Sequence, residues 1–344
     1  MNRKCVFRDG RIISDSEKPY IICEVNSSHN GKMDVAKEMI LEAKKSGCDC
    51  VKFQSWSTES LYSQTYYKQN PIAKRFVKTF SLSLDEQLEL AQFCKDNEIA
   101  FSSTPYSKEE VDFLVDKCEV PFIKIASMEL NNDDFLRYIA KKNCPIVLSS
   151  GMGEIDELKH AVEVILSEGN DQICLLHCIS IYPAEPDTIH LNNILGLREL
   201  FPEIPIGFSD HSLGTDLSIA AIAMGARIIE KHFTLDKNRV GMDNNMAIEP
   251  EEMTRLVDGC NRVYEALGSK ERVVSEAEYE QRKNMRRSLI LTRNMSAGEI
   301  ITEADLDAKR PGTGIAPNEK YRVIGKKLVN DVNADELLNE SDFI

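Results

Sequence analysis

The chain has 344 residues, and its 42 basic and 56 acidic side chains give a formal net charge of −14 at pH 7. This acidic balance argues against nucleic acid as a partner, because neutralising phosphates requires clustered lysine and arginine. A hydrophobic content of 42% and a charged content of 28% exclude a disordered chain. No apolar run approaches the roughly 20 residues that span a bilayer, and no apolar signal segment opens the sequence. We expect a soluble cytoplasmic protein, with no membrane partner, whose ten scattered cysteines are reduced.

Short apolar runs recur along the first 280 residues, and helical patterns follow them. The runs predict strands near 21–25, 50–54, 99–103, 122–126, 145–149, 173–177, 205–208 and 227–231. Amphipathic stretches predict helices at 34–46, 85–97, 107–117, 133–142, 154–168 and 213–224. Nearly continuous apolar strands that alternate with helices indicate a parallel sheet covered by helices. We predict a (β/α)8 TIM barrel over residues 1–283. A doubly wound open sheet is the alternative, but no glycine-rich dinucleotide fingerprint follows the first strand.

The pattern changes after residue 283. From Arg287 the sequence is typical of short strands and turns, as in the segments 288–292, 297–299 and 310–314. We therefore predict a separate, small, β-rich domain over residues 284–344.

Polar residues end all eight predicted strands, and in a barrel of this kind the chemistry lies at the carboxyl ends of the strands. These residues are Glu24, Lys52, Gln54, Ser103, Thr104, Lys124, Ser127, Ser149, Ser150, His177, Ser209, Asp210, His211, Glu230, Lys231 and His232. Because the strand ends converge on the barrel axis, the sequence predicts one ligand site there.

Two histidines, His211 and His232, end consecutive strands and should be neighbours. Two imidazoles could hold a divalent metal and leave coordination positions free for water and substrate oxygens. The alternative is that one of them is a structural histidine. His29 and His177 are weaker candidates, and the zinc-protease spacing HExxH is absent.

Lys52 and Lys124 lie within apolar strands, so they need partners if they point inward. They could bind an anionic substrate, form a Schiff base, or be neutralised by carboxylates. Ser149 and Ser150 precede a helix, where backbone N–H groups could bind a phosphate, although serines there are often N-caps. Together these residues favour a small substrate that bears a carboxylate and a phosphate.

At these residues the sequence resembles the sialic acid synthase family, which comprises N-acetylneuraminate synthase and its legionaminate and pseudaminate relatives. The motifs that carry the resemblance lie at 24–31, 51–54, 103–105, 124–127, 148–152, 176–178, 182–183, 207–211 and 229–234. The segment Lys309-Arg-Pro-Gly-Thr-Gly314 resembles the antifreeze-like (SAF) domain of that family. The resemblance covers essentially the whole chain.

The resemblance implies condensation of phosphoenolpyruvate with a six-carbon N-acyl amino sugar, which gives a nine-carbon 2-keto acid and phosphate. It implies a divalent metal, usually Mn²⁺ with Mg²⁺ or Co²⁺ as alternatives, held by His211 and His232, and a catalytic role for Glu24. The positions that match phosphoenolpyruvate binding are Lys52, Thr104, Lys124, Ser127, Ser150, Ser180 and Ser209. The positions that match sugar binding are Gln54, Tyr182, Asp243 and Arg310.

The resemblance also implies a domain-swapped homodimer, in which Arg310 closes the barrel mouth of the partner chain. Four departures from the family pattern, at Asn26, Ser28, Ser180 and Met242, leave the acceptor sugar open. Two other functions remain as alternatives. One is a Schiff-base aldolase that uses Lys52, Lys124 or Lys231, and the other is a non-catalytic carbohydrate-binding protein.

Overall fold

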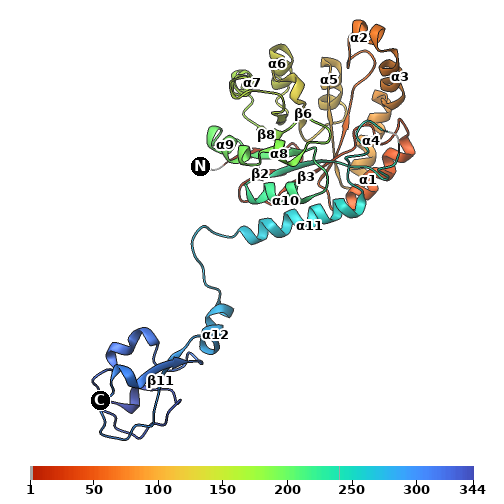
Figure 1. Ribbon diagram of the computed structural model, residues 1–344. Coiled ribbons are helices and arrows are strands. Elements are labelled where there is room, and N and C mark those ends of the chain that lie inside the picture. The colour runs from red at the N-terminus through yellow and green to blue at the C-terminus, as the bar shows by residue number, and fades with distance from the viewer. Residues whose placement is uncertain (1–2, 240) are drawn as a thin grey trace. The chain divides into compact units, whose positions relative to one another are not determined.

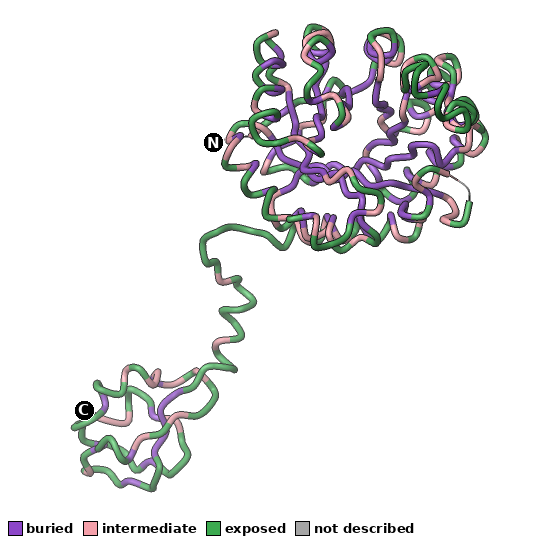
Figure 2. Tube along the Cα trace, turned by 45° about the horizontal axis from the view of Figure 1, so that its top comes forward, coloured by how far each residue is buried: buried purple, intermediate pink, exposed green. Residues whose placement is uncertain are grey.

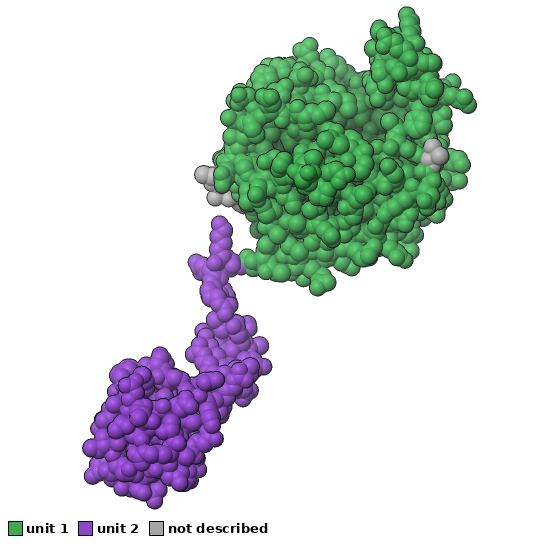
Figure 3. All heavy atoms as spheres, viewed as in Figure 1, with its two compact units in different colours: residues 1–268 green, residues 269–344 purple. Residues whose placement is uncertain are grey.

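The computed structural model describes residues 3–239 and 241–344. The chain divides into two compact units, Met1–Gly268 and Ser269–Ile344, which Figure 3 distinguishes by colour. The predicted domain boundary at residue 283 falls inside helix α12 (Glu276–Met285), which belongs to the second unit.

The first unit contains an eight-stranded parallel sheet that curls into a nearly closed barrel (Figure 1). Its strands are β3 (Tyr20–Glu24), β4 (Cys50–Gln54), β5 (Ala100–Thr104), β6 (Ile123–Ile125), β7 (Ile146–Ser149), β8 (Ile173–Cys178), β9 (Ile206–Asp210) and β10 (Ile228–His232). The strand order is β5-β4-β3-β10-β9-β8-β7-β6. The first barrel strand, β3, therefore pairs with the last, β10. The predicted (β/α)8 barrel is confirmed.

Strands β5 and β6 are the two edges of this sheet, and they lie in contact. The Ser102 hydroxyl of β5 donates a hydrogen bond of 2.9 Å to the carbonyl oxygen of Phe122, just before β6. A side chain thus bridges the seam where the barrel closes.

A helix follows each barrel strand and covers its outer face. These helices are α1 (Met33–Lys45), α4 (Leu84–Asp96), α5 (Lys108–Asp116), α6 (Asp133–Ala140), α7 (Ile155–Ser167), α9 (Asn192–Leu200), α10 (Asp216–Ala223) and α11 (Pro250–Leu267). Their starts are encoded locally: at α4, for example, Ser83 and Glu86 form a capping box that satisfies the amide groups of the first turn. In the described ranges, no helix combines the length and the apolar character needed to cross a membrane.

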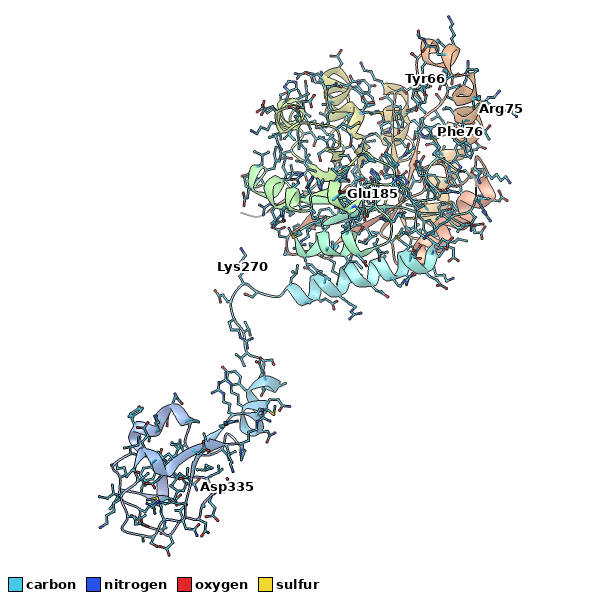
Figure 4. All side chains as sticks on the ribbon, viewed as in Figure 1. Tyr66, Arg75, Phe76, Glu185, Lys270 and Asp335 are labelled. Carbon is cyan, nitrogen blue, oxygen red and sulfur yellow. The ribbon has the colours of Figure 1, made fainter. Side chains whose placement is uncertain are left out.

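Short helices interrupt two of the loops that follow strands at the carboxyl end of the barrel. Helices α2 (Gln64–Gln69) and α3 (Pro71–Phe80) lie between β4 and α4, and α8 (Pro186–Ile189) lies between β8 and α9. Figure 4 labels Tyr66, Arg75 and Phe76 on α2 and α3. A 3-10 turn, η1 (Ser127–Glu129), follows β6.

Alternate residues of each barrel strand point inward, and they change from apolar to polar partway along the strand. The apolar layer contains Ile22, Cys50, Phe122, Val147, Cys174, Leu176 and Ile228. A hairpin of β1 (Lys4–Val6) and β2 (Ile12–Ser14) packs on this layer. The Phe7 ring lies 4.6 Å from the Phe122 ring and 5.3 Å from the Tyr20 ring, between centroids. The amino-terminal end of the barrel is therefore a filled apolar core. In Figure 2 the buried residues gather toward the centre of the first unit.

Strand β9 contributes a glycine, Gly207, to this packed region. A Cβ atom at Gly207 would come within 2.6 Å of the Ile228 carbonyl oxygen, so a larger residue there would displace the neighbouring strand. The layer beyond Gly207 is polar, and it forms the floor of the site.

The second unit is small and loop-rich. Its described strands β11 (Ser288–Leu291) and β12 (Leu306–Lys309) pair antiparallel, and the 3-10 turns η2 (Glu303–Asp305), η3 (Pro317–Arg322) and η4 (Glu340–Asp342) connect its loops. It has its own core, formed by Leu289, Leu291, Met295, Ile301, Ile315, Val323, Leu328, Val332 and Leu338. Helix α12 contributes no buried residue to that core. The predicted small β-rich domain is confirmed.

Candidate active site

A cavity of about 380 Å³ opens at the carboxyl ends of the barrel strands. Twelve of the predicted site residues line it: Glu24, Lys52, Gln54, Thr104, Lys124, Ser127, Ser180, Tyr182, Ser209, His211, His232 and Asp243. They come from seven of the eight barrel strands or from the loops that follow those strands, so the fold brings together residues that are up to 219 positions apart (243 − 24). The parallel arrangement explains this convergence, because every strand delivers its last inward residue to the same end.

Two predicted residues lie elsewhere in the described chain. The backbone N–H of Ser150 donates to the Leu176 carbonyl oxygen at 3.0 Å, and its side chain is outside the cavity lining. Arg310 is an exposed residue of the second unit. Their predicted roles stay predictions.

Four buried charges form the floor of the cavity. The Lys52 ammonium contacts the Glu24 carboxylate and lies 3.5 Å from Glu230 Oε2. The Lys124 ammonium lies 3.6 Å from Glu230 Oε1, and Ser209 donates a hydrogen bond of 2.8 Å to the same oxygen. Two lysines and two glutamates therefore alternate around the barrel interior, where each charge has an opposite neighbour.

The surroundings move the pKa values of the two glutamates in opposite directions. Burial would raise the pKa of Glu230, but Lys124 and Lys52 outweigh it and lower that pKa to about 2. Burial raises the pKa of Glu24; Lys52 acts against this rise, and Glu230 adds to it. Glu230 is thus a fixed negative charge, whereas Glu24, which is 1% exposed, is suited to exchange a proton.

The Gln54 amide is held in one orientation. The Tyr106 hydroxyl and the Trp56 indole N–H both donate to Gln54 Oε1, at 2.7 Å and 2.9 Å. Gln54 Nε2 then donates to Glu24 Oε1 at 3.2 Å, and the backbone N–H of Asn26 donates to the same oxygen at 2.9 Å. These bonds fix the Glu24 carboxylate in the cavity.

The His211 and His232 rings lie 5.2 Å apart between centroids. His211 Nδ1 lies 2.7 Å from the Ile179 carbonyl oxygen, so this nitrogen carries a proton and Nε2 is the nitrogen that could bind a metal. Burial holds the pKa of His232 well below its usual value, and its ring is therefore neutral. Burial would lower the pKa of His211, but Cys178 and the Ile179 carbonyl group outweigh burial and raise it. The His232 ring is thus in the neutral form that a metal ligand requires, whereas His211 must release a proton to bind a metal.

Within the described ranges, His211 and His232 are the two histidines that line the cavity and could hold a metal. Across residues 3–239 and 241–344, no group of three or more His, Cys, Asp and Glu side chains is arranged to hold a metal. Asp243 Oδ2 lies 3.6 Å from His232 Nδ1 and orients that ring. The residues therefore fit an open divalent site, in which His211 and His232 would hold the metal and water and substrate oxygens would fill the other positions.

A second group of polar atoms lies around Gly151. The Lys124 ammonium donates to Ser149 Oγ at 2.7 Å, and the Gly151 N–H donates to Ser127 Oγ at 2.9 Å. A Cβ atom at Gly151 would come within 2.7 Å of Ser127 Oγ and would also collide with Ser180 Oγ. The absence of a side chain at Gly151 leaves room between these hydroxyls for an anion.

Cys178 joins this group to the histidines. Its Sγ lies 3.7 Å from Ser127 Oγ and 4.0 Å from His211 Nδ1. Burial would raise the pKa of the thiol, but His211 and Lys124 outweigh burial and lower it to about 7.

Three of the four departures from the family pattern lie in two loops that touch. The Asn26 side chain donates to Asp243, Ser28 donates to Asn244 Oδ1 at 2.5 Å, and the Met242 N–H donates to Ser27 Oγ at 3.2 Å. These loops follow β3 and β10, which are neighbours in the sheet. The fourth departure, Ser180, lies with the hydroxyls around Gly151.

The sequence analysis assigned no individual role to several residues of the cavity, which are Asn26, Trp56, Tyr106, Cys178 and Glu230. Glu230 is among the polar strand ends of the sequence analysis, and its inward orientation follows once His232 is taken to face the cavity, because the two residues are two positions apart and share one face of β10. Trp56 and Tyr106 follow strands in loops, where no periodic signal exists.

Two other candidates point away from the cavity. His177 stacks on Phe208, with ring centroids 5.6 Å apart, and one ring nitrogen lies 2.6 Å from the Ile189 carbonyl oxygen. Lys231 pairs with Asp210 outside the cavity lining. Both residues occupy outward positions of their strands, so neither contacts a ligand in this cavity.

Comparison with known proteins agrees with this architecture. Residues 39–272 match the NeuB family, and residues 286–344 match the SAF domain. N,N'-diacetyllegionaminic acid synthase of Legionella pneumophila is 36% identical, and the alignment covers 93% of each chain. Human N-acetylneuraminate-9-phosphate synthase is 33% identical, with 96% of this chain and 94% of the relative covered. The crystal structure of N-acetylneuraminic acid synthetase from Leptospira borgpetersenii, in complex with citrate, superposes with a TM-score of 0.75 at 30% identity. It covers 82% of this chain and 95% of that chain.

A (β/α)8 barrel with a charged cavity at the carboxyl ends of its strands defines the class of TIM-barrel enzymes. Within that class, the chain belongs to the NeuB family and carries a SAF domain at its carboxyl-terminal side. The resemblance stated from the sequence motifs is confirmed.

Proposed function

We propose that the protein is a nonulosonic acid synthase. In this proposal it condenses phosphoenolpyruvate with an N-acyl amino hexose and water, and releases a nine-carbon 2-keto acid and inorganic phosphate. The observation that carries the proposal is the pair of buried lysines, Lys52 and Lys124, next to the two imidazoles of His211 and His232 in one cavity. Relatives that are named as synthases of such acids support it.

Phosphoenolpyruvate would bind at the floor of the cavity. Lys52 and Lys124 supply two ammonium groups, and Thr104 lies 3.1 Å from the Lys52 ammonium. The hydroxyls of Ser127 and Ser180 surround the space beside Gly151, which suits a phosphate. Ser209 and Ser150 are the remaining residues proposed for this anion.

His211 and His232 would hold the divalent metal, which we propose to be Mn²⁺, with Mg²⁺ or Co²⁺ as substitutes. When bound, the metal supplies a Lewis acid that polarises the aldehyde oxygen of the sugar. Asp243 and the Ile179 carbonyl group orient the two imidazoles toward that task.

The chemical steps balance without any other reactant. Carbon 3 of the enol attacks the aldehyde carbon, water adds to carbon 2, and the C–O bond to phosphate breaks. Glu24 would position that water and accept its proton, since its pKa is raised and its carboxylate is fixed by Gln54 and the Asn26 N–H. Lys52 would compensate the charge of Glu24 during proton transfer.

The acceptor would be an uncharged sugar. The cavity lining holds the carboxylates of Glu24, Glu230 and Asp243, and two lysines. A phosphate on the acceptor would therefore find no further lysine or arginine among the described lining residues. The outer part of the lining includes Met128, Met152 and Met242, which are exposed and apolar. These side chains suit an N-acyl methyl group or a deoxy carbon, with Gln54, Tyr182 and Asp243 contacting the hydroxyl groups.

We also propose that the active enzyme is a domain-swapped homodimer in the cytoplasm. In this arrangement Arg310 of the partner chain would contact the acceptor, because an arginine can hydrogen-bond an N-acyl carbonyl group while it stays charged.

The test is a set of incubations with phosphoenolpyruvate, Mn²⁺ and a panel of N-acyl hexosamines, with and without 6-phosphate or 6-deoxy groups. Phosphate release that depends on an unphosphorylated sugar is the expected result. Phosphoenolpyruvate labelled with ¹⁸O at the bridging oxygen should yield labelled phosphate, because the C–O bond breaks. Unlabelled phosphate would reject the mechanism. A lysine adduct trapped by borohydride with pyruvate would favour the aldolase instead.

A further inference from the structure

We propose that the buried ion pair between Lys231 and Asp210 is the positioning element that sets the geometry of the two metal-binding histidines. This inference rests on the metal site of the proposed function. Lys231 directly precedes His232, and Asp210 directly precedes His211. The pair lies on the outer side of the barrel wall, whereas the histidines point into the cavity.

The sheet register places the two charges opposite each other. Lys231 pairs with Asp210 across the ladder between β9 and β10. The Lys231 ammonium lies 2.9 Å from Asp210 Oδ2, and the two residues are 0% and 1% exposed. Residues alternate between the two faces of a strand, so His232 and His211 follow Lys231 and Asp210 on the inner face. A bond between Lys231 and Asp210 therefore fixes the distance between the strands at the point where the two histidines begin.

The same ammonium also holds the backbone that follows His211. Lys231 donates to the Ser212 carbonyl oxygen at 2.6 Å, so it binds the residues on both sides of His211. Asp210 Oδ1 accepts from the Ser212 N–H at 2.8 Å and from the Ser212 hydroxyl at 2.6 Å. Oδ2 accepts from Ser218 of α10 at 2.5 Å. The Asp210 carboxylate therefore holds the turn that carries His211 through three hydrogen bonds.

The energetics favour a positioning role over a stabilising one. Removing two charges from water costs several kcal/mol per ion in general, and apolar residues of similar volume often give equal or greater stability at such positions. The Lys231–Asp210 pair contacts neither the floor lysines nor the cavity. Unlike an apolar contact, the pair forms directional bonds. Lys231 bonds to Asp210 across the two strands and to the Ser212 carbonyl oxygen, and both partners are sequence neighbours of His211.

The test measures Mn²⁺ binding directly, by electron paramagnetic resonance of the free ion, in the full-length protein. The variant Asp210→Asn/Lys231→Met removes both charges at nearly constant volume, so neither is left unpaired. We expect its Mn²⁺ dissociation constant to rise about 10- to 100-fold, the range typical for loss of residues that orient metal ligands. The KM for phosphoenolpyruvate should stay within about twofold, because Lys52 and Lys124 are untouched.

The matched control is Asp15→Asn. Asp15 accepts from Arg198 at 2.8 Å and from Arg3 at 3.0 Å, so it is also a paired carboxylate, but Arg3 lies beside the amino-terminal hairpin, away from both histidines. This variant should bind Mn²⁺ like the wild type. A folded double variant with unchanged Mn²⁺ affinity would overturn the inference.

A second variant keeps the test decisive if the double variant does not fold. Ser218→Ala removes only one bond to Asp210 and should weaken Mn²⁺ binding by a smaller factor, about two- to fivefold. Unchanged affinity in Ser218→Ala would then count against the inference. Absence of Mn²⁺ binding by the wild type would reject the metal site itself, and the positioning role with it.

Discussion

At the scale of single residues, the cavity gives the carboxylates of Glu24 and Glu230 different pKa values through their different surroundings. Glu230 faces two lysines and stays ionised, whereas Glu24 faces one lysine, a carboxylate and a largely dry environment. Similar side chains in one cavity can therefore hold different protonation states, which lets one serve as a fixed charge and the other as a proton carrier.

The first prediction is that Glu24→Gln lowers kcat by about 10²- to 10⁴-fold, because the amide cannot accept a proton from the attacking water. The KM for phosphoenolpyruvate should change little, since Lys52 keeps Glu230 as a partner. Steady-state phosphate release measures both constants. Tyr106→Phe, which removes one of two donors to Gln54, is the control and should cost less than tenfold. Full turnover by Glu24→Gln would show that another group handles the proton.

The second prediction concerns acid stability. His29 is buried, and burial lowers its pKa to about 4 from 6.5, although a backbone hydrogen bond opposes this. The unfolded chain therefore takes up a proton at a higher pH than the native protein does. Stability from this residue is complete above pH 6.5 and is lost as the pH falls toward 4, by at most about 3 kcal/mol.

Urea unfolding at pH 7.5 and pH 4.5 tests this linkage. The wild type and His29→Asn should both lose stability on acidification, but the variant should lose about 2 kcal/mol less. Equal losses in the two proteins would assign the acid sensitivity to other groups.

At the scale of elements, the hairpin β1–β2 matters because it completes the amino-terminal core of the barrel. Phe7 packs between Tyr20 and Phe122 and is 2% exposed. Phe7→Ala should cost about 3 to 5 kcal/mol of unfolding free energy, from lost burial and from the cavity left behind. Denaturant unfolding gives the value, and turnover per folded molecule should be unchanged. A lower turnover at full folding would mean that the hairpin also shapes the site.

The barrel elements could be predicted because their signals are strong and local. A strand such as β8, covered by helices outside and by the core inside, leaves a continuous apolar run in the sequence. The predicted site follows from the same logic, since residues that end parallel strands converge. The hairpin and helices α2 and α3 were missed because they are short, and the α2–α3 segment is rich in exposed polar residues.

The finer features of the site could not be predicted from spacing. Lys231 and Glu230 are neighbours in sequence, yet one faces the outer helices and the other faces Lys52. Only the pleat of β10 decides between them, and its phase is set by the whole sheet. Likewise, Trp56 and Tyr106 meet Gln54 because two loops fold over the barrel mouth.

At the scale of the whole molecule, the first expectation is that turnover depends on a metal. Dialysis against a chelator should abolish phosphate release, and Mn²⁺ should restore it, because the cavity offers two imidazoles and no other close ligand group among the described residues. His211→Ala should lose the same activity without regaining it on metal addition at ordinary concentrations. Fully active protein without metal would contradict the proposed mechanism.

The second expectation concerns assembly. If Arg310 acts on the partner chain, Arg310→Ala and His211→Ala should each be nearly inactive alone. Random re-association of the two variants would give one intact site per heterodimer and roughly a quarter of wild-type activity. Tagged subunits confirm the exchange. No recovery after confirmed exchange would reject the swapped dimer and leave the chemistry standing.

The filled amino-terminal end of the barrel has a kinetic consequence. Lys52 lies one inward position below Gln54 on β4. Glu230, which neighbours both Lys52 and Lys124, lies one inward position below His232 on β10. The apolar layer of the barrel closes the space beneath these charges. Under the proposed function, both substrates would pass through the same opening, and a sugar seated at the histidines would block the path to the lysines. We therefore expect phosphoenolpyruvate to bind first and the acceptor second. Product-inhibition patterns should show this compulsory order.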